Sequence, residues 1–181
     1  MTLDKPALRA RIRVERALFV ASHPPAIEPP AQFLAHLSHG LTVASYVPMP
    51  GEADPSPLAR AAVERGCAIV LPHVTRRSEP MRFLAWDSEA DLVSGPYGLQ
   101  QPHHESPVLA PDIILTPLVA FDSRLNRLGQ GAGYYDRAFA QFPQCWRIGV
   151  AWNMQQVENL PADPWDVPLH AVVTERGWII P

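Results

Sequence analysis

The sequence is poor in cysteine and in lysine and has no long apolar run, and each shortage excludes a class of protein. Its two cysteines, Cys67 and Cys145, lie far apart and form no Cys-x-x-Cys pair, so nothing indicates a disulfide framework. A reducing cytoplasm is the expected compartment for such a chain. No apolar run approaches the roughly 20 residues that a membrane-spanning helix needs, and the N-terminus lacks the apolar region of a signal peptide. The sequence therefore predicts a cytoplasmic protein with no membrane partner.

Net charge is also small, because the formal value is −3 and the pI is about 6.1. Such a balance offers no bulk attraction to nucleic acid, so no nucleic-acid partner is expected. Lys5 is the only lysine among 15 Lys and Arg residues, which draws attention to the N-terminal segment. A chain of 181 residues fits one domain, residues 1–181, with enough length to bury a sizeable core, and we expect a monomer.

Proline is abundant instead. The 21 prolines gather mainly at 24–30, 48–57, 102–111 and 161–168. Apolar segments alternate with these clusters throughout the chain, and this alternation indicates long ordered connections rather than disorder.

Helical and strand-like apolar patterns alternate along the whole chain. The predicted helices cover 5–21, 33–37, 57–65 and 134–141, and the predicted strands cover 41–46, 67–71, 81–86, 113–116, 146–151, 171–174 and 178–180. Two strand–helix–strand units follow from this order, and the last two strands form a hairpin. The predicted fold class is therefore α/β: a three-layer α/β/α domain with a mostly parallel central sheet and a C-terminal hairpin. The loop after the first strand then lies at the carboxyl edge of the sheet, where such folds bind ligands.

The first predicted helix has two different sides. Asp4 can cap it, and Pro6 suits its first turn. Its apolar side is expected to contain Leu8, Ile12, Val14, Leu18 and Phe19. Its basic side contains Lys5, Arg9 and Arg13, which follow at four-residue intervals and so share a face. A basic stripe of this kind is either a solvated surface or a contact for an anionic ligand.

A glycine-rich stretch at 127–137 reads Arg-Leu-Gly-Gln-Gly-Ala-Gly-Tyr-Tyr-Asp-Arg and directly precedes a predicted helix. Glycine lets the backbone approach a ligand closely, and the free N–H groups at a helix N-terminus attract anions. Arg127 and Arg137 add positive charge, and Asp136 offers the hard oxygen that Mg²⁺ prefers. A tight turn before a helix is the competing interpretation of the glycines alone.

Several other motifs are absent from the sequence. The loop is not a Walker A sequence, because the chain contains no Gly-Lys-Ser/Thr, and its glycine spacing differs from Gly-x-Gly-x-x-Gly. Gly-x-Ser-x-Gly is absent too, so an α/β-hydrolase triad has no support. His36 and His39 make a poor metal site, because no further ligands lie near them in the sequence. The run at 103–105 also makes a poor metal site, because adjacent side chains rarely converge on one ion.

The string from 127 to 137 resembles the signature of the 5-formyltetrahydrofolate cyclo-ligase family, also called methenyltetrahydrofolate synthetases. The likeness extends to Lys5 and Arg9, which match an N-terminal Lys-x-x-x-Arg, and to segments 95–102, 117–122 and 160–168. It implies a fold similar to that of isomerases and CoA-transferases. It also implies a reaction, in which Mg-ATP drives the conversion of 5-formyltetrahydrofolate to 5,10-methenyltetrahydrofolate with release of ADP and phosphate.

The resemblance also assigns site residues. ATP, the co-substrate, would lie against Lys5, Pro6, Ala7, Leu8, Arg9, Arg127, Leu128, Gly129, Gln130, Gly131, Ala132, Gly133, Tyr134 and Tyr135. The folate substrate would contact Arg9, Val47, Glu52, Tyr97, Gln130 and Tyr134. Asp136 and Asp166 would hold the Mg²⁺ cofactor. Tyr134 and Arg127 would act in catalysis, Tyr134 by facing the formyl group and Arg127 by offsetting negative charge on the phosphates.

Two positions depart from the family pattern. Gln130 stands where the family often has arginine, and Ala132 stands where it often has glycine. Gln130 can donate hydrogen bonds but brings no charge, which predicts a lower affinity for the nucleotide. Ala132 is free of strain only if its φ is negative.

Two alternatives to the cyclo-ligase remain open. One is a non-catalytic folate- or nucleotide-binding paralogue on the same scaffold, although the lysine and carboxylates matched to the family are intact. The other is a different α/β enzyme, such as a sugar-phosphate isomerase or a CoA-transferase relative. Those enzymes need no ATP, so a requirement for magnesium and nucleotide separates them from a cyclo-ligase.

Overall fold

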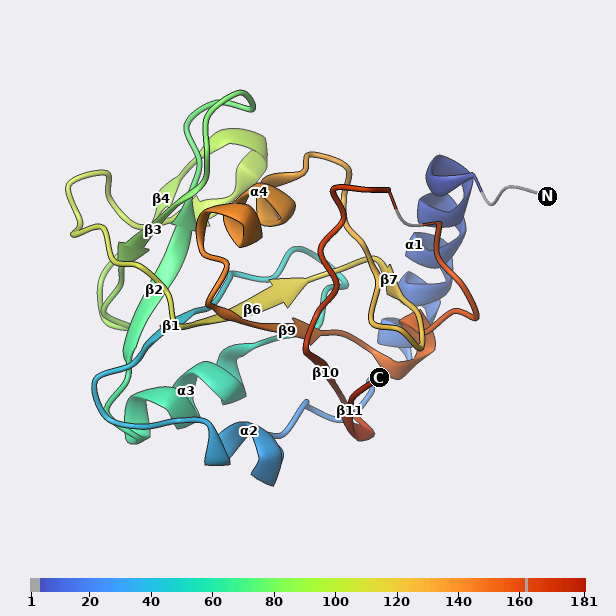
Figure 1. Cartoon of the computed structure of the whole chain (residues 1–181), viewed down its shortest axis with the longest axis horizontal. Coiled ribbons are helices and arrows are strands. Elements are labelled where there is room, and N and C mark those ends of the chain that lie inside the picture. Colours follow the sequence, from blue (N-terminus) through green and yellow to red (C-terminus); the bar gives the residue numbers. More distant parts are fainter. Residues whose placement is uncertain (1–3, 162) are drawn as a thin grey trace.

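A seven-stranded sheet forms the centre of the computed structural model, which describes residues 4–161 and 163–181 (Figure 1). Its strands lie in the order β11-β10-β9-β6-β1-β2-β3. In that order they span Gly177–Ile179, Ala171–Thr174, Trp146–Val150, Ile113–Pro117, Thr42–Ala44, Ala68–His73 and Arg82–Ala85. The four inner pairings are parallel, and the edge strands β11 and β3 pair antiparallel with their neighbours. The expected mostly parallel sheet is confirmed.

Helices cover both faces of this sheet. α2 (Ala31–Ala35) and α3 (Ser56–Glu64) lie on one face, and α4 (Tyr134–Gln141) lies on the other (Figure 1). Neighbouring strand residues point to opposite faces, so Val43 packs into the core with Leu58 of α3, whereas Ala44 packs into the core with Phe139 of α4. This arrangement is the predicted three-layer α/β/α architecture.

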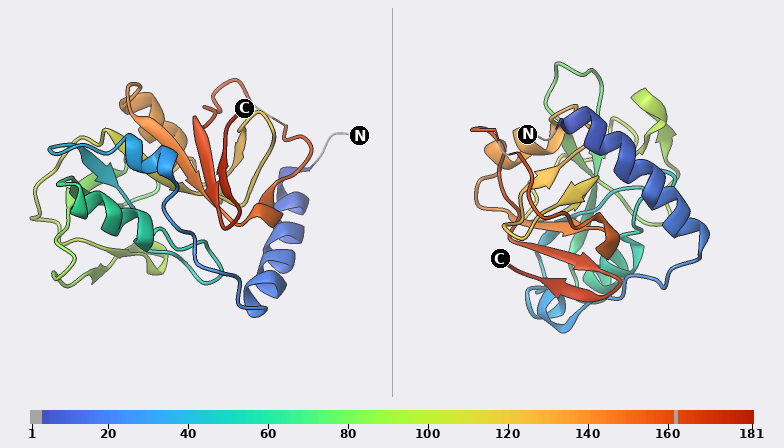
Figure 2. Two further views of the ribbon diagram at one scale, coloured as in Figure 1. Left: turned by 90° about the horizontal axis from the view of Figure 1, so that it is seen from below. Right: turned by 90° about the vertical axis from the view of Figure 1, so that its right-hand side faces the viewer.

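Helix α1 (Lys5–Ala21) stands beside the sheet rather than over one of its faces (Figures 1 and 2). Leu8 and Ile12 pack against a small ribbon formed by β7 (Ala120–Phe121) and β8 (Arg127–Leu128). The expected apolar side was wrong in one respect, because Val14 is 63% exposed and Leu18 is 70% exposed. The buried residues of α1 are Leu8, Ile12 and Arg16, which define a narrower face than the apolar residues of the sequence suggest.

The remaining elements are short, and the sequence did not predict most of them. β4 (Val93–Ser94) and β5 (Gln100–Gln101) form a second ribbon around the 3-10 turn η1 (Pro96–Gly98), and η2 (Asn153–Gln155) follows β9. The second helix, α2, spans Ala31–Ala35, so it begins and ends two residues before the predicted range 33–37. Among the helices of the described residues, none is long and apolar enough to cross a membrane.

The predicted C-terminal hairpin is confirmed. β10 and β11 pair antiparallel, and Gly177 at the turn has a φ of 122°. β10 also pairs in parallel with β9, so the hairpin extends the central sheet. The proline-rich loop before β10 brings Asp163 and Asp166 to Lys5 of α1.

Candidate active site

A pocket of about 490 Å³ lies at the carboxyl ends of β1, β2 and β6, the edge at which parallel sheets bind ligands. Its volume is in the range of small-molecule sites. Its wall has a charged part formed by Lys5, Arg9, Arg127, Asp136, Asp163 and Asp166. The rest of its wall is mainly apolar or aromatic and includes Tyr46, Val47, Met49, Pro72, Val74, Met81, Tyr97, Leu99 and Tyr134. The loop at 129–133 lies along this pocket, which can therefore hold a ligand with one anionic and one flat apolar portion.

The backbone of the glycine loop, residues 129–133, adopts conformations that favour glycine. Gly131 has a φ of 104° and Gly133 a φ of 71°, values that residues with a side chain rarely adopt. A Cβ at Gly129 would lie 2.5 Å from Nη1 of Arg127, so the end of that side chain would have to shift. Ala132 is not among the residues with positive φ, so alanine fits at this position without backbone strain.

The main-chain N–H groups of the glycine loop are available to a ligand. Within residues 4–161 and 163–181, none of those from Gly129 to Gly133 donates a hydrogen bond. The carbonyl groups are engaged instead, since Arg9 Nε donates to Gly129 O at 2.7 Å and Arg137 Nη1 donates to Ala132 O at 3.1 Å. The loop leads directly into α4, whose N-terminus carries partial positive charge. An anion in the pocket would thus meet several unpaired donors.

Helix α1 turns its basic side toward this loop. Lys5 and Arg9 both line the pocket, as the resemblance implied for an ATP contact. Pro6 and Ala7 are exposed, and Leu8 is only 4% exposed in the core beneath the helix. None of these three residues is among those that line the pocket. Lys5 and Arg9 therefore lie at the pocket, as expected for an ATP contact, whereas the side chains of residues 6–8 lie outside it.

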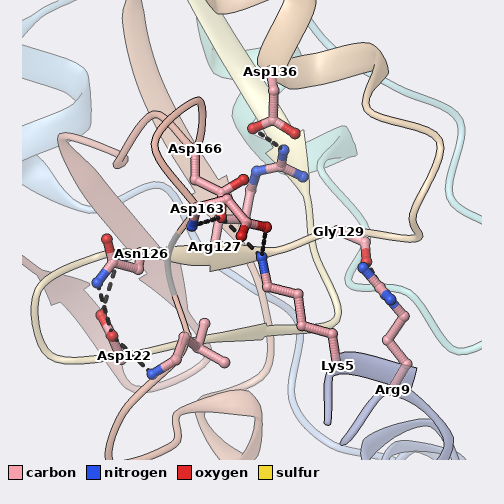
Figure 3. A network of polar contacts seen from close by, with 10 residues as sticks. Lys5, Arg9, Asp122, Asn126, Arg127, Gly129, Asp136, Asp163 and Asp166 are labelled. Atoms are coloured by element: carbon pink, nitrogen blue, oxygen red, sulfur yellow. Dashed lines mark hydrogen bonds and ion pairs between the residues drawn. The ribbon is translucent and has the colours of Figure 1, made fainter. Parts of the chain in front are cut away.

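The two aspartates that the resemblance assigns to a metal each take part in an ion pair (Figure 3). Arg127 donates from Nη2 to Asp136 Oδ1 at 2.9 Å, and the Arg127 side chain is only 5% exposed. Lys5 Nζ lies 3.0 Å from Asp166 Oδ2 and 2.6 Å from Asp163 Oδ2. Asp166 Oδ2 also accepts the N–H of Asp163 at 2.8 Å. The carboxylates of this wall are thus balanced by cations of the protein itself.

These carboxylates fit Mg²⁺ in their chemistry. In the described part of the chain, no three His, Cys, Asp or Glu side chains form a metal cage. Mg²⁺ does not require one, because one or two carboxylates usually hold it together with water and substrate phosphates. Asp136 Oδ2 and Asp166 Oδ1 accept no hydrogen bond from the described residues, so each side chain keeps one oxygen for a cation. A metal role for the two aspartates stays a prediction with which this donor set agrees.

Gln130, the first departure from the family pattern, joins two charged residues. Its Nε2 donates to Glu52 Oε1 at 3.2 Å, and its Oε1 accepts from Arg13 Nη2 at 2.5 Å. Glu52 is also fixed by its own loop, because Oε2 accepts the N–H of Met49 at 2.9 Å. The guanidinium of Arg13 therefore lies beside Gln130, the side chain that lacks the positive charge of the family's arginine. The sequence placed Arg13 on the same helix face as Arg9 but gave it no role.

Aromatic side chains form another part of the pocket wall. Tyr97 lines the pocket although it is 64% exposed, and its φ of 63° shows that it also belongs to a tight turn. Val47 lines the pocket at the end of β1. Burial raises the pKa of the Tyr134 hydroxyl, and the neighbouring Tyr97 adds to the rise. The Tyr134 hydroxyl oxygen is enclosed and has no hydrogen-bond partner within the described residues. The phenol is therefore neutral near pH 7.

The structure gathers most of the predicted site residues around one pocket. The lining residues include Lys5, Arg9, Val47, Glu52, Tyr97, Arg127, Leu128, Gly129, Gln130, Gly131, Ala132, Gly133, Tyr134, Tyr135, Asp136 and Asp166. Sequence reasoning gave no role to Asp163 and Trp165, which also line it. Asp163 stands three residues before Asp166 in the same acidic loop, and that spacing was the available signal. Trp165 is 69% exposed, and nothing in the sequence pattern distinguishes it from a surface residue.

The fold and the pocket together define a class: an α/β protein whose mostly parallel sheet presents a glycine loop, cations and carboxylates to one ligand pocket. The model of the 5-formyltetrahydrofolate cyclo-ligase family matches residues 2–175. The chain belongs to that family.

Individual relatives agree with this assignment. The 5-formyltetrahydrofolate cyclo-ligase of Escherichia coli K12 is 36% identical over 140 residues, covering 74% of this chain and 77% of the relative. Among solved structures, a 5,10-methenyltetrahydrofolate synthetase from Aquifex aeolicus has a TM-score of 0.73 and 29% identity, covering 97% of this chain and 92% of its own. The corresponding synthetase from Mycoplasma pneumoniae has a TM-score of 0.72 and 27% identity, covering 96% and 99%.

Proposed function

We propose that this protein is an enzyme that converts 5-formyltetrahydrofolate to 5,10-methenyltetrahydrofolate, with Mg-ATP as the co-substrate and ADP and phosphate as the other products. The observation that carries the proposal is the composition of one pocket. Unpaired N–H groups of the glycine loop, two cations of α1 and two aspartates lie in the same cavity as an aromatic and apolar wall. Membership of the family supports the reaction independently of that geometry.

The charged wall suits the triphosphate of ATP. The N–H groups of Gly129 to Gly133 would hold phosphate oxygens, and Lys5, Arg9 and Arg127 would offset their charge. Asp136 and Asp166 would hold Mg²⁺, which supplies further charge neutralisation at the phosphates when bound. The protein would therefore act on phosphoryl transfer by positioning the reactants and stabilising charge.

The aromatic wall suits the folate. Val47 and Tyr97 offer apolar and flat surfaces to the pterin ring system, and Glu52 can accept hydrogen bonds from its amino and ring N–H groups. Gln130, between Glu52 and Arg13, would contact the same ligand. Tyr134, which lines the pocket, would face the formyl group. The two ligands would then meet at the glycine loop, which lies along both walls.

The reaction needs ATP because the formyl oxygen is a poor leaving group. That oxygen attacks the terminal phosphorus of ATP, the bond from this phosphorus to the bridging oxygen breaks, and ADP leaves. N10 of the folate then attacks the activated formyl carbon and closes the ring. The bond from carbon to the phosphorylated oxygen breaks, phosphate leaves, and the proton of N10 passes to solvent. No general base is assigned, because the neutral ring-closing nitrogen is already nucleophilic.

The test is a direct assay of the methenyl product by its absorbance. Protein, Mg-ATP and 5-formyltetrahydrofolate are mixed, and parallel reactions omit ATP, omit Mg²⁺ or include a chelator. We expect absorbance to appear only in the complete mixture. Folate binding without any ATP-dependent product would instead identify a non-catalytic paralogue, and product formation without ATP would refute the proposed phosphorylation step.

The same proposal includes a cytoplasmic monomer with no nucleic-acid or membrane partner. The net charge of −3 supports the absence of a nucleic-acid partner, because it gives no bulk attraction to polyanions. Light scattering on the purified protein tests the oligomeric state, and a mass well above 20.0 kDa would contradict a monomer.

A further inference from the structure

Two arginines that the proposed chemistry does not use bond to residues lining the pocket, although they are not among the lining residues themselves. Arg77 comes from the loop between β2 and β3, and Arg137 comes from the first turns of α4. Both side chains are exposed. In the described part of the chain, no carboxylate lies within ion-pair distance of either guanidinium. Two positive charges are therefore held close to the site without a carboxylate partner among residues 4–161 and 163–181.

Hydrogen bonds hold these guanidinium groups near one another. Arg137 donates from Nη1 to Ala132 O at 3.1 Å and from Nη2 to Arg77 O at 3.4 Å. Arg77 donates from Nη2 to Gly131 O at 3.4 Å. Arg9 also lies close to Gly131, because its guanidinium carbon is 3.6 Å from the position that a Cβ of residue 131 would take. Arg77 and Arg137 thus bind the carbonyl groups of Gly131 and Ala132, whereas Arg9 of α1 binds that of Gly129.

The pair also borders the aromatic wall. The guanidinium carbon of Arg137 lies 5.0 Å from the centre of the Tyr134 ring. Arg77 and Arg137 both act on the Tyr134 hydroxyl, whose pKa they lower against the larger opposing effect of burial. Tyr97 contacts the same hydroxyl region and lines the pocket. A flat ligand lying along Tyr134 and Tyr97 would therefore carry any anionic extension toward the two arginines.

We propose that Arg77 and Arg137 form an anion subsite for the carboxylates of the glutamyl tail of the folate substrate. The proposal rests on the proposed function, since it concerns the ligand of the same pocket. A reduced folate is a flat ring system joined through an aminobenzoyl group to glutamate, which carries two carboxylates. Guanidinium groups bind carboxylates with a forked geometry that suits this ligand. The phosphates of ATP share the anionic chemistry, but the free N–H groups of the glycine loop and the cations of α1 already serve them.

Equilibrium binding tests the subsite with three folates that differ only in the tail: 5-formyltetrahydropteroate, which has no glutamate, 5-formyltetrahydrofolate and its triglutamate. Titration calorimetry gives the dissociation constants of each folate and of Mg-ATP. For the unaltered protein we expect affinity to increase with the number of glutamates. In Arg77→Ala the triglutamate should bind about fivefold more weakly, the loss typical of one exposed ion pair, while the pteroate constant changes by less than twofold.

Arg76→Ala is the matched control. It removes the same charge one residue away, and Arg76 is 80% exposed on its side chain and lies near Glu79 rather than the pocket. Among the described residues, the Arg77 side chain makes only one long hydrogen bond, so its replacement should leave folding intact, which circular dichroism verifies. Arg137→Gln is the second variant and should also reduce the tail dependence.

The outcomes separate the subsite from the proposed function. Equal loss of pteroate and triglutamate affinity, a weaker constant for Mg-ATP alone, or equal effects of Arg76→Ala and Arg77→Ala would each overturn the subsite. Tail-dependent binding without turnover would support the subsite and overturn the proposed reaction. Turnover without any dependence on the tail would support the reaction and overturn the subsite. No folate binding at all would overturn both.

Discussion

Arg127 carries its charge at a position that is almost closed to water. Its side chain is 5% exposed, its Nη2 is paired with Asp136, and its Nε has no hydrogen-bond partner among the described residues. The guanidinium also lies 5.8 Å from the Tyr135 ring centre and 5.7 Å from that of Phe139. A buried cation of this kind depends strongly on its one carboxylate. Asp136 therefore has a structural role beside the metal role that the sequence suggested.

Two substitutions of Asp136 separate those roles. Asp136→Asn keeps an oxygen that can accept from Arg127, so we expect turnover to be lost at moderate Mg²⁺ while the free energy of unfolding falls by about 1 kcal/mol or less. Asp136→Ala leaves the guanidinium unpaired and should cost about 1–3 kcal/mol in addition. Urea unfolding followed by circular dichroism and an Mg²⁺ titration of turnover provide the two measurements. Normal turnover in Asp136→Asn would remove this residue from the metal site.

At the scale of elements, α1 connects core packing to the pocket. One face buries Leu8 and Ile12 against the β7–β8 ribbon, and the neighbouring face holds Lys5 and Arg9 at the glycine loop. Because a helix is rigid over this length, the packing of Ile12 fixes where both cations lie. The ribbon also ends at Arg127–Leu128, directly before the loop. The position of α1 therefore affects both stability and ligand binding.

Ile12→Ala is expected to weaken both properties. Ile12 is 1% exposed, so removing its side chain should lower the free energy of unfolding by about 2–4 kcal/mol. We also expect a higher KM for ATP, because α1 can shift into the cavity that is left and move Lys5 and Arg9. Val14→Ala serves as the control on the same helix, since Val14 is 63% exposed and should change stability by about 0.5 kcal/mol or less. Denaturant unfolding and steady-state kinetics decide the matter, and equal effects of the two variants would contradict this role of α1.

The sequence predicted the elements that carry a strong local pattern and missed those that depend on distant contacts. Helix α4 was predicted with its observed bounds, Tyr134–Gln141, because glycines end the preceding loop and an apolar helix pattern begins. The apolar side of α1 was partly wrong, because Val14 and Leu18 are apolar but only tertiary packing determines which face is buried. Likewise, no local pattern could show that Arg13 would bond Gln130, which is 117 residues away.

At the scale of the whole molecule, burial shifts the pKa of several histidines and tyrosines so that they stay neutral over a wider pH range. Burial lowers the pKa of His73 and of His170 below 6.5, the ordinary value. Burial raises the pKa of Tyr46 and Tyr135 above 10.0. Unfolding releases these groups, so the unfolded chain gains protons first in acid and loses them first in alkali. Burial also raises the pKa of Cys67 and Cys145 above 9.0, so stability is expected to be highest between about pH 6.5 and 9 and to fall on both sides.

His73 provides the test of the acid side. It is 4% exposed, and the nearby Arg82, His103 and His104 reinforce the lowering of its pKa by burial. Its contribution is present above pH 6.5 and is lost as the pH falls through the lower folded value, by up to about 1.4 kcal/mol per pH unit. His73→Gln has no titrating ring, so its free energy of unfolding should decline less between pH 7 and pH 5.5. Urea unfolding across that interval measures the slopes, and parallel slopes would exclude His73 as a source of acid sensitivity.

Lys5 links the two ends of the chain, because its ammonium pairs with Asp163 and Asp166 of the loop before the C-terminal hairpin. A ligand that contacts both Lys5 and Asp166 should therefore stabilise the whole molecule against unfolding. At 100 times its dissociation constant, Mg-ATP is expected to add about 2.7 kcal/mol to the free energy of unfolding, and a chelator should remove most of this increment. In Lys5→Met the increment at the same ligand concentration should be much smaller. Arg11→Met on the same helix is the control, because Arg11 is exposed and pairs only with Glu15 among the described residues. Thermal unfolding with and without Mg-ATP measures the increments, and equal values in the two variants would show that Lys5 does not contact the nucleotide.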